Sequence, residues 1–378
     1  MSDTSLGLYI HWPFCARICP YCDFNVYRAR GNDDALFEAL LADLDYWAGQ
    51  FSGRRLTSIH FGGGTPSLMS GRQIGQLIDR AQAGFGFEPD IEIGLEANPN
   101  DASRFEDFAA AGINRLSLGV QSFHDEALKA LGRDHDGAAS RAALDTALSV
   151  FDNVSIDLIY AREGQTERDW ATELASALAA GLPHLSLYQL TIEPGTAFAK
   201  RVERGELTPP GDDLGERLYR LTQRMCREAG LVGYEISNHA QLGAESRHNR
   251  LYWEGADWIG IGPGAHGRIG SAATGGRLST ETALRPADYT RRVAETGTGS
   301  KAETLSALDE ARERILMGLR IDGGLDLEHL KRATGQSVNA EELHRYTEQG
   351  WLTTTGSRLR FTDEGRLLAD GIAAALCP

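Results

Sequence analysis

The chain has 378 residues, of which 42% are hydrophobic and 24% are charged, an ordinary composition for a globular protein. Its formal net charge of −15 argues against nonspecific binding to nucleic acid or to an anionic membrane surface. Residues 1–6 lack the basic and apolar regions of a secretion signal, and no apolar run approaches the roughly 20 residues of a membrane span. We therefore expect a cytoplasmic protein without stable membrane insertion.

In the first 240 residues, short runs of β-forming residues alternate with longer amphipathic stretches, which is typical of βα units around a parallel sheet. The pattern predicts helices at 33–47, 101–111, 166–180 and 213–229. It predicts strands at 6–12, 56–61, 91–97, 115–121, 154–160 and 185–191, and a weaker seventh strand at 233–238. Because these units are too few for a closed (β/α)8 barrel, we predict an α/β fold with a partial, open (β/α)6-type barrel.

One face of the predicted strands is polar, because side chains alternate between the two faces of a strand. This face carries small or polar residues, namely Glu92, Gly94, Glu96, Asn98, Ser117, Gly119, Gln121, Ser155 and Asp157. A barrel interior of this kind is not a filled apolar core. It predicts a cavity for a polar ligand at the carboxyl ends of the strands, where barrel sites lie.

The pattern changes after residue 240. Residues 241–300 are rich in glycine and aromatic residues, and a loop is predicted at 270–282. Residues 301–378 read as three helices, a hairpin around Gly356 and a final helix from Asp363, which predicts a winged-helix-like module. We therefore divide the chain into a barrel at 1–240, a Gly- and aromatic-rich segment at 241–300 and a C-terminal module at 301–378.

Three of the five cysteines, Cys15, Cys19 and Cys22, fall within eight residues, which in a reducing compartment points to metal before disulfides. Three thiolates can hold a four-iron cluster and leave one iron open for another ligand. Alternatively, His11 completes a Cys3His zinc site, or the thiols carry no metal. Spacing favours the cluster and leaves the other two possibilities open. We assign no role to Cys226 or Cys377.

Glycines 62–64 follow a predicted strand, where they either form a tight turn or let the backbone approach a ligand. They are not a phosphate loop, because no Lys-Ser or Lys-Thr pair follows them. The acceptors Glu96, Asn98, Gln121 and Asp157 suit a ligand with an ammonium group and hydroxyls, although each could instead cap a helix. In residues 248–253, a helix would place His248 and Tyr252 on one face, as a heme ligand with an aromatic neighbour or as ordinary core.

The string Tyr-Ile-His-Trp-Pro-Phe-Cys-Ala-Arg-Ile-Cys-Pro-Tyr-Cys at residues 9–22 resembles the cluster loop of radical S-adenosylmethionine (radical SAM) proteins. Within these, the chain resembles the group of oxygen-independent coproporphyrinogen III dehydrogenases (HemN) and heme chaperones (HemW), and the chaperones most. Further matches lie at residues 61–66, 119–123 and 156–160 and in the C-terminal module. A departure at residues 160–164, Tyr-Ala-Arg-Glu-Gly, puts the family's loop after Asp157 in doubt.

The resemblance implies a [4Fe-4S] cluster on Cys15, Cys19 and Cys22, with S-adenosylmethionine (SAM) beside it. The SAM-binding positions that align with this chain are Tyr9, Gly63, Gly64, Thr65, Glu96, Gln121, Arg133 and Asp157. Gln189 and His266 fall where the family also lines the site. Whether SAM is cleaved stays open.

Two functions share this fold and cluster. The first is a chaperone that binds heme and transfers it to an acceptor haemoprotein, with His248 of the His-Asn-x-x-Tyr-Trp pattern as heme ligand. The second is the dehydrogenase, which decarboxylates propionates by radical oxidation. Phe24 stands where the dehydrogenases have a further cysteine, and only eight residues precede Tyr9, so we expect the chaperone without coproporphyrinogen III oxidase activity. Arg17, Arg28 and Arg250 are candidates to bind propionates.

Overall fold

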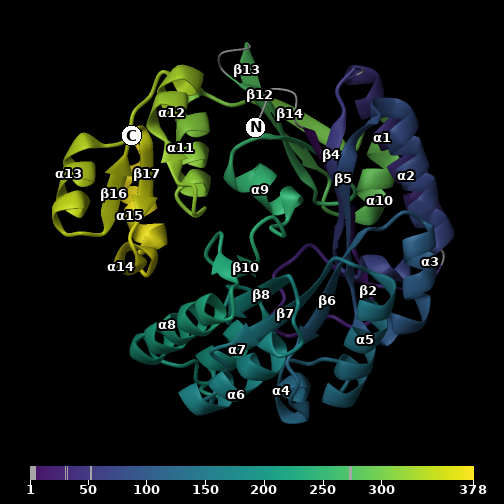
Figure 1. The fold of residues 1–378 in the computed structure, drawn as a ribbon. Helices are drawn as coiled ribbons and strands as arrows, with labels where there is room; N and C mark the ends of the chain where they lie inside the picture. Colours follow the sequence, from purple (N-terminus) through teal and green to yellow (C-terminus); the bar gives the residue numbers. More distant parts are fainter. Residues whose placement is uncertain (1–5, 30, 32, 52, 272–274) are drawn as a thin grey trace.

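The structure is a computed structural model, which describes residues 6–29, 31, 33–51, 53–271 and 275–378 (Figure 1). Its main sheet has the strand order β14-β13-β12-β11-β1-β4-β5-β6-β7-β8-β10-β9. The parallel part contains β1 (Leu6–Trp12), β4 (Leu56–Gly63), β5 (Phe87–Ala97), β6 (Arg115–Gln121), β7 (Val154–Tyr160) and β8 (His184–Gln189). These are the six clear strands predicted from the sequence, so the open α/β barrel is confirmed.

Helices cover the outer face of this curved sheet (Figure 1). They include α1 (Asp34–Gln50), α2 (Gly71–Phe85), α3 (Phe105–Ala110), α4 (Asp125–Ala130), α5 (Gly137–Val150), α6 (Glu167–Leu178) and α8 (Asp212–Glu228). The short helix α7 (Ala197–Glu203) instead packs on the segment around Pro20 and Tyr21. The helix expected at 101–111 is divided, because a 3-10 turn at Pro99–Arg104 precedes α3. No helix in the described part of the chain is long and apolar enough to cross a membrane.

The seventh strand predicted at 233–238 is wrong. Residues there form two short strands, β9 (Val232–Gly233) and β10 (Asn238–Ala240), and β10 pairs antiparallel with β8. The carboxylate of Glu235 accepts hydrogen bonds from the backbone N–H groups of Ser237 and Asn238, which turns the chain between them. The seventh parallel strand is instead β11 (Asp257–Ile261), which pairs with β1 at the other edge of the barrel.

The loop predicted at 270–282 is also wrong, because most of it belongs to a hairpin. Strands β12 (His266–Ser271) and β13 (Gly276–Thr282) pair antiparallel, and β14 (Ser300–Thr304) continues the sheet after α10 (Pro286–Thr296). Residues 272–274 of the expected loop lie outside the described residues. The Gly-, Ser- and Thr-rich composition hid strands that are stabilised by pairing with distant residues.

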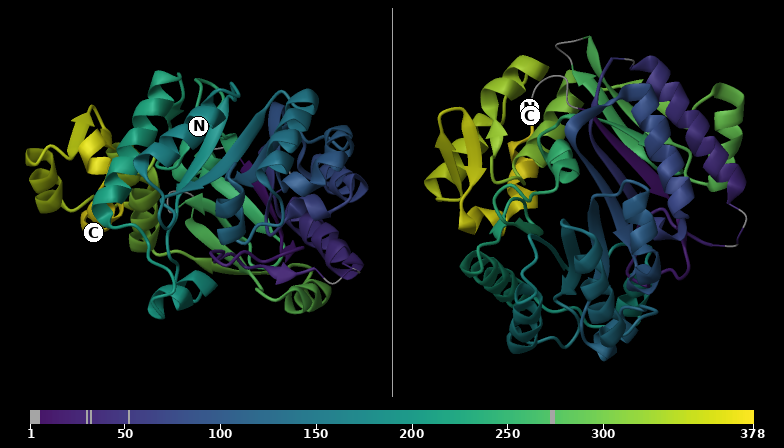
Figure 2. Two further views of the ribbon diagram at one scale, coloured as in Figure 1. Left: turned by 90° about the horizontal axis from the view of Figure 1, so that it is seen from below. Right: turned by 45° about the vertical axis from the view of Figure 1, so that its right-hand side comes forward.

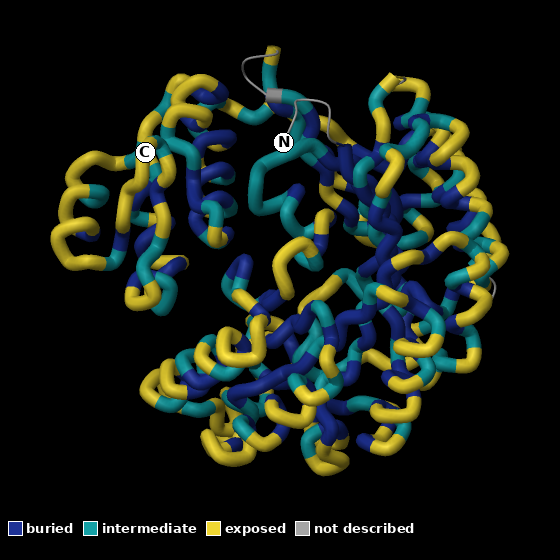
Figure 3. The backbone as a smooth tube through the Cα atoms, in the orientation of Figure 1, coloured by how far each residue is buried: buried dark blue, intermediate teal, exposed yellow. Residues whose placement is uncertain are grey.

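The C-terminal residues form a small α+β unit with a core of its own (Figure 3). It contains α11 (Ala307–Gly318), β15 (Leu325–Asp326), α12 (Leu327–Thr334), α13 (Ala340–Glu348), β16 (Leu352–Thr355), β17 (Arg358–Phe361), α14 (Asp363–Arg366) and α15 (Ala369–Leu376). Its helices, hairpin and final helices follow the predicted order, although β15 was not predicted. In all views the unit lies on the side of the barrel away from α1 and α2 (Figure 2).

Candidate functional site

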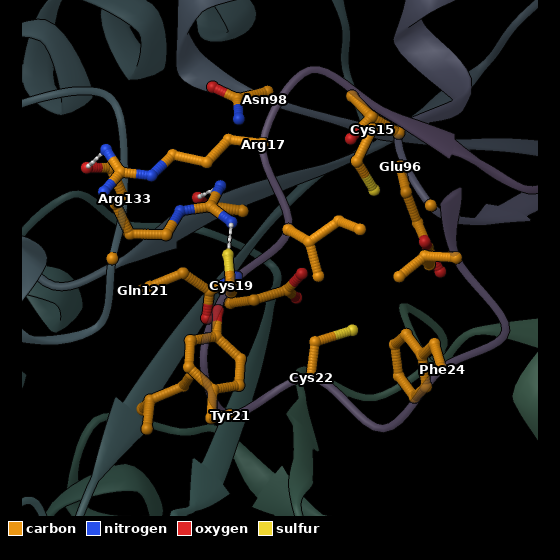
Figure 4. A pocket seen from close by; sticks show the side chains of 18 of the residues that line it. Cys15, Arg17, Cys19, Tyr21, Cys22, Phe24, Glu96, Asn98, Gln121 and Arg133 are labelled. Atoms are coloured by element: carbon orange, nitrogen blue, oxygen red, sulfur yellow. Dashed lines mark hydrogen bonds between the residues drawn. The ribbon is translucent and has the colours of Figure 1, made fainter. Parts of the chain in front are cut away.

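A cavity of about 330 Å³ lies at the carboxyl ends of the barrel strands (Figure 4). It is called the cluster pocket here, and its size is typical of a small-molecule site. The residues expected at the site that line it are Cys15, Cys19, Cys22, Gly63, Gly64, Thr65, Glu96, Asn98, Gln121, Arg133, Asp157 and Gln189. Tyr9 and His266 are not among the lining residues. The structure therefore brings most of the predicted site together from five strands of the barrel, the loops that follow them and the segment that carries the cysteines.

The three clustered cysteines lie on the loop that joins β2 (Phe14–Cys15) to β3 (Tyr27–Arg28). The loop is held at its base, where Tyr27 N–H donates to Pro13 O at 2.7 Å and Ala29 N–H donates to Cys15 O at 2.9 Å. Figure 4 shows the three side chains at the edge of the same pocket. Three thiol ligands from one short loop, facing a cavity, fit a [4Fe-4S] cluster with one iron open to a second ligand.

The zinc alternative does not fit the geometry. Hydrogen bonds occupy both ring nitrogens of His11, from Nδ1 to Tyr9 Oη at 3.0 Å and from Nε2 to Asn25 O at 3.0 Å. Throughout the described ranges, no group of three or more His, Cys, Asp or Glu side chains is placed to hold a single metal ion. His11 instead links β1 to the cluster loop through its hydrogen bond to Asn25 O. The side chain of Asn25 holds the loop further, since it donates to Pro263 O and Leu284 O.

The glycine loop after β4 packs directly on the cluster loop. Gly64 N–H donates to Trp12 O at 2.7 Å, and Thr65 N–H donates to Phe14 O at 2.9 Å. A Cβ on Gly64 would lie 2.7 Å from Phe14 O, and Gly63 has a φ of 110°. The glycines therefore serve a close approach of two backbones as well as lining the pocket.

Replacing Gly64 by alanine is expected to destabilise this junction. The new methyl group would meet backbone atoms that cannot move without displacing the cluster loop, at a cost of about 1–3 kcal/mol. Chemical denaturation would measure the loss. Gly49→Ala is the matched control, because Gly49 lies in α1 with nothing within 4 Å of an added Cβ. A Gly64→Ala protein as stable as the Gly49→Ala protein would contradict this role.

Two carboxylates stand at the pocket, Glu96 from β5 and Asp157 from β7, with β6 between them. Glu96 accepts from Gly63 N–H at 3.3 Å and contacts His60 Nε2 at 3.1 Å. Asp157 accepts from the Ser117 hydroxyl at 3.0 Å. Burial, followed by the charge of Glu96, raises the pKa of Asp157 to about 6. Hydrogen bonds from nearby protein groups hold both carboxylates in place, and their oxygens can accept from a cationic ligand.

Arg133 links the cluster loop to β6. Its Nη1 donates to Cys19 Sγ at 3.3 Å and its Nη2 donates to Gly119 O at 3.1 Å. Gln121, at the end of β6, has a φ of 64°, an uncommon backbone conformation for a residue other than glycine. Such strain is concentrated at functional sites. Both residues lie where the pocket meets the cysteines.

The helix α9 (Arg247–Trp253) lies against the inner side of the barrel, and His248 is 1% exposed. The carboxylate of Glu92 caps the start of the helix, accepting from Arg247 N–H and His248 N–H, each at 3.1 Å. Ser155, another polar lumen residue, bonds His184 at 2.7 Å. Glu92 and Ser155 are thus bound by buried protein groups and do not line the cluster pocket, whereas Ser117, which pairs with Ser155 across β6 and β7, does line it.

His248 is fully engaged within the protein. Hydrogen bonds join its Nδ1 to Ser58 Oγ at 2.9 Å and its Nε2 to Tyr252 Oη at 2.6 Å. Its ring stacks on His60 with centroids 4.9 Å apart. Burial, followed by the charge of His60, lowers its pKa well below the ordinary value, so the imidazole is neutral. A neutral imidazole is the form that binds iron, but neither nitrogen is open here.

Several pocket residues were not predicted from the sequence. Tyr21 and Phe24 come from the cluster loop, Asp134 follows Arg133, and Tyr188 lies on β8 next to Gln189. Phe24 is 64% exposed at the pocket. The cluster loop itself was a usable signal, since every residue from Cys15 to Cys19 lines the pocket. Strand alternation gave no signal for Tyr188, because both it and its neighbour Gln189 reach the pocket.

Two family models match separate parts of the chain. A family model described as the radical SAM superfamily matches residues 9–175, and one described as the HemN C-terminal domain matches residues 305–368. The solved structure of coproporphyrinogen III oxidase (HemN) from Escherichia coli has a TM-score of 0.83 and 23% identity, covering 99% of this chain and 90% of that one. This likeness shows the shared fold.

Curated relatives align along almost the whole chain. The heme chaperone HemW of Mycobacterium tuberculosis is 36% identical over 384 residues, with 100% of this chain and 96% of the relative covered. The radical S-adenosyl methionine domain-containing protein 1, mitochondrial, of Danio rerio is 37% identical, with 97% and 85% covered. The chain therefore belongs to the radical SAM superfamily, in the group that contains HemN and the heme chaperones named HemW.

Proposed function

We propose that this chain is a heme chaperone, which binds heme and transfers it to an acceptor haemoprotein. The proposal is carried by the full-length similarity to relatives named HemW. The exposed Phe24 in the cluster loop, at the position where the dehydrogenases have a further cysteine, favours the chaperone over the coproporphyrinogen III dehydrogenase. The acceptor is a haemoprotein of unknown identity. We place this function in the cytoplasm, where reducing conditions keep thiols available for a cluster.

The cluster and SAM are assigned to the cluster pocket. Cys15, Cys19 and Cys22 would hold a [4Fe-4S] cluster, which supplies an open iron for SAM when bound. The SAM-binding residues proposed are Gly63, Gly64, Thr65, Glu96, Gln121, Arg133 and Asp157, which line the pocket. Tyr9 does not line the pocket, so it would contribute indirectly, through its hydrogen bond to His11. These residues bind and orient SAM; the proposal does not require that SAM be cleaved.

Binding of SAM is expected to weaken as the pH falls from 8 to 5. Protonation of Asp157, whose pKa is raised to about 6, removes a negative charge that would face a cationic ligand. The other charged groups nearby are Glu96 and His60. Isothermal titration with SAM across this pH range measures the effect. In Asp157→Asn the part of the pH dependence centred near 6 should disappear, whereas the exposed Asp145→Asn should keep it. An unaltered profile in Asp157→Asn would exclude this role.

The experiment that tests the function is a titration of the anaerobically purified chain with heme, followed by absorption in the Soret region. We expect saturable binding. Absorption that rises in proportion to added heme, without saturation, would leave the chain without a heme site and refute the proposal. For His248, which the resemblance implies as heme ligand, binding requires that its hydrogen bond to Ser58 or Tyr252 be broken.

A further inference from the structure

A second cavity of about 790 Å³ lies between the barrel and the C-terminal unit. It is called the arginine cavity here. Its walls come from α9, β11, β12 and β13 on one side and from α11, α12, β15 and β17 on the other. Figure 1 shows α11 and α12 next to α9, where the two parts of the chain face each other. The cavity is separate from the cluster pocket, because the two have no lining residue in common.

The charge of this cavity is opposite to that of the protein as a whole. Three carboxylates line it, Glu254, Asp257 and Asp326, in a chain of net charge −15. They face seven arginines, Arg54, Arg250, Arg277, Arg314, Arg332, Arg358 and Arg360. Guanidinium groups are the side chains best suited to bidentate binding of carboxylate and phosphate. Such a concentration of arginines in a large cavity is typical of an anion site.

Six of the seven arginines have a carboxylate within 4.0 Å, and these pairs differ in strength; Arg250, for example, lies 2.8 Å from Glu254. Asp257 serves two of them, at 2.6 Å from Arg54 and 3.6 Å from Arg277. Arg314 pairs with Glu310 at 2.9 Å, outside the lining. Arg277 and Arg314 are both buried, at 3% and 8% exposure. Glu310 balances the charge of Arg314, whereas Arg277 has only the longer contact with Asp257, so Arg277 is the buried guanidinium that an anionic ligand would stabilise more.

The arginines of α12 and β17 form long ion pairs or, among the described residues, none. Arg358 lies 3.6 Å from Asp326 and Arg332 lies 3.5 Å from Glu328, both at the long end for an ion pair. Arg360 donates to Gly323 O and forms no ion pair with any residue that the structure describes. Exposed pairs of this kind contribute little to stability. Their guanidinium groups can therefore turn to a ligand at little cost.

The cavity also has an apolar wall. Phe51, Trp253, Ile321 and Leu330 contribute to it. The indole Nε1 of Trp253 is buried and has no hydrogen-bond partner among the described residues. Trp253 and Arg250 belong to α9, the helix that carries His248 on its opposite, barrel-facing side. A ligand that suits these walls has a flat apolar body and at least two anionic groups.

We infer that the arginine cavity binds a small amphipathic molecule with two anionic groups, and that these groups are the propionates of heme. The second part rests on the proposed function. In this arrangement Arg358, Arg360 and Arg332 bind the carboxylates and Trp253 packs against the macrocycle. His248 lies on the opposite side of α9, so the iron of a heme bound in this cavity would reach His248 only after α9 turns and the hydrogen bonds of His248 break.

The test compares Arg358→Gln/Arg360→Gln with a control of equal charge, Arg168→Gln/Arg291→Gln, whose arginines are exposed on α6 and α10. We expect the Kd for heme to rise at least about tenfold in the cavity variant and to stay unchanged in the control. Arg332→Gln repeats the test from α12. Heme dimethyl ester, which lacks free carboxylates, should bind the native chain weakly and be insensitive to these substitutions. An ester that binds as tightly as heme would overturn the assignment to propionates.

Pyrophosphate tests the anion site without heme. Its binding, measured by calorimetry, should be weakened by Arg358→Gln/Arg360→Gln and not by the control. If the native chain fails to bind heme, the proposed function fails, while variant-sensitive pyrophosphate binding would still support an anion site. If heme binds equally well to the native chain and the cavity variant, and pyrophosphate does not bind, this inference is overturned and the proposed function stands.

Discussion

Replacing Cys19 by alanine is expected to remove the iron–sulfur cluster from the chain. Cys19 lies in the middle of the cluster loop, and Arg133 donates a hydrogen bond to its sulfur. With two thiolates left, the cluster loses one of its three protein ligands and becomes labile. Iron and sulfide analysis of the anaerobically purified protein should show a small fraction of the native content. The broad absorption near 400 nm, a region expected for such clusters, should disappear with it.

Cys377→Ala is the matched control for this substitution. Cys377 is a half-buried thiol near the end of α15, remote in sequence from the cluster loop. Its removal should leave both iron content and absorption unchanged. Cys15→Ala and Cys22→Ala should behave like Cys19→Ala. A Cys19→Ala protein that retains native iron and absorption, while all variants are folded by circular dichroism, would refute the assignment of the three ligands.

His248→Ala is expected to raise the Kd for heme by about tenfold or more, the change that corresponds to the loss of at least about 1.4 kcal/mol of binding free energy. In the proposed function this imidazole is an iron ligand, and the substitution removes it. Iron–sulfur content should not change, because His248 does not line the cluster pocket. Heme titration and the position of the Soret band measure both the affinity and the ligand.

Tyr252→Phe distinguishes two roles of His248, iron ligation and packing of α9. It keeps the aromatic ring but removes the hydroxyl that bonds His248 Nε2 at 2.6 Å, and so frees a nitrogen for iron. We expect heme affinity to be retained or increased in this variant. If His248 only supports the packing of α9, both variants should weaken heme binding in proportion to lost stability, with the same Soret band as the native chain. That result would remove His248 from the heme site.

The barrel was predictable because its strands have strong local signals. Leu6–Trp12, Arg115–Gln121 and Val154–Tyr160 begin and end in the structure where the sequence predicted them. In each strand, buried apolar residues either alternate with polar ones or form a continuous run, and turn-forming residues follow. Where the signal depended on partners far away in sequence, the prediction failed. β11 has only five residues, and the β12–β13 hairpin is rich in glycine, serine and threonine; pairing across the sheet stabilises these strands.

The cluster pocket was predictable from motifs, because most of its residues lie within short, recognisable strings. The hydrogen bonds between elements distant in the sequence could not be predicted in this way. The contacts of His11 with Asn25, of Glu92 with α9 and of His248 with Ser58 join residues 14 to 190 positions apart. The arginine cavity is a further case, since its arginines come from barrel and C-terminal unit alike. No spacing rule brings such residues together.

The choice between chaperone and dehydrogenase is tested most directly by incubating the cluster-loaded chain anaerobically with coproporphyrinogen III, SAM and dithionite. Chromatography of the porphyrins, after oxidation of the sample, reports the product. We expect coproporphyrinogen III to be recovered unchanged from a preparation that binds heme saturably. Formation of protoporphyrinogen IX would contradict the chaperone assignment and identify the chain as the decarboxylating dehydrogenase.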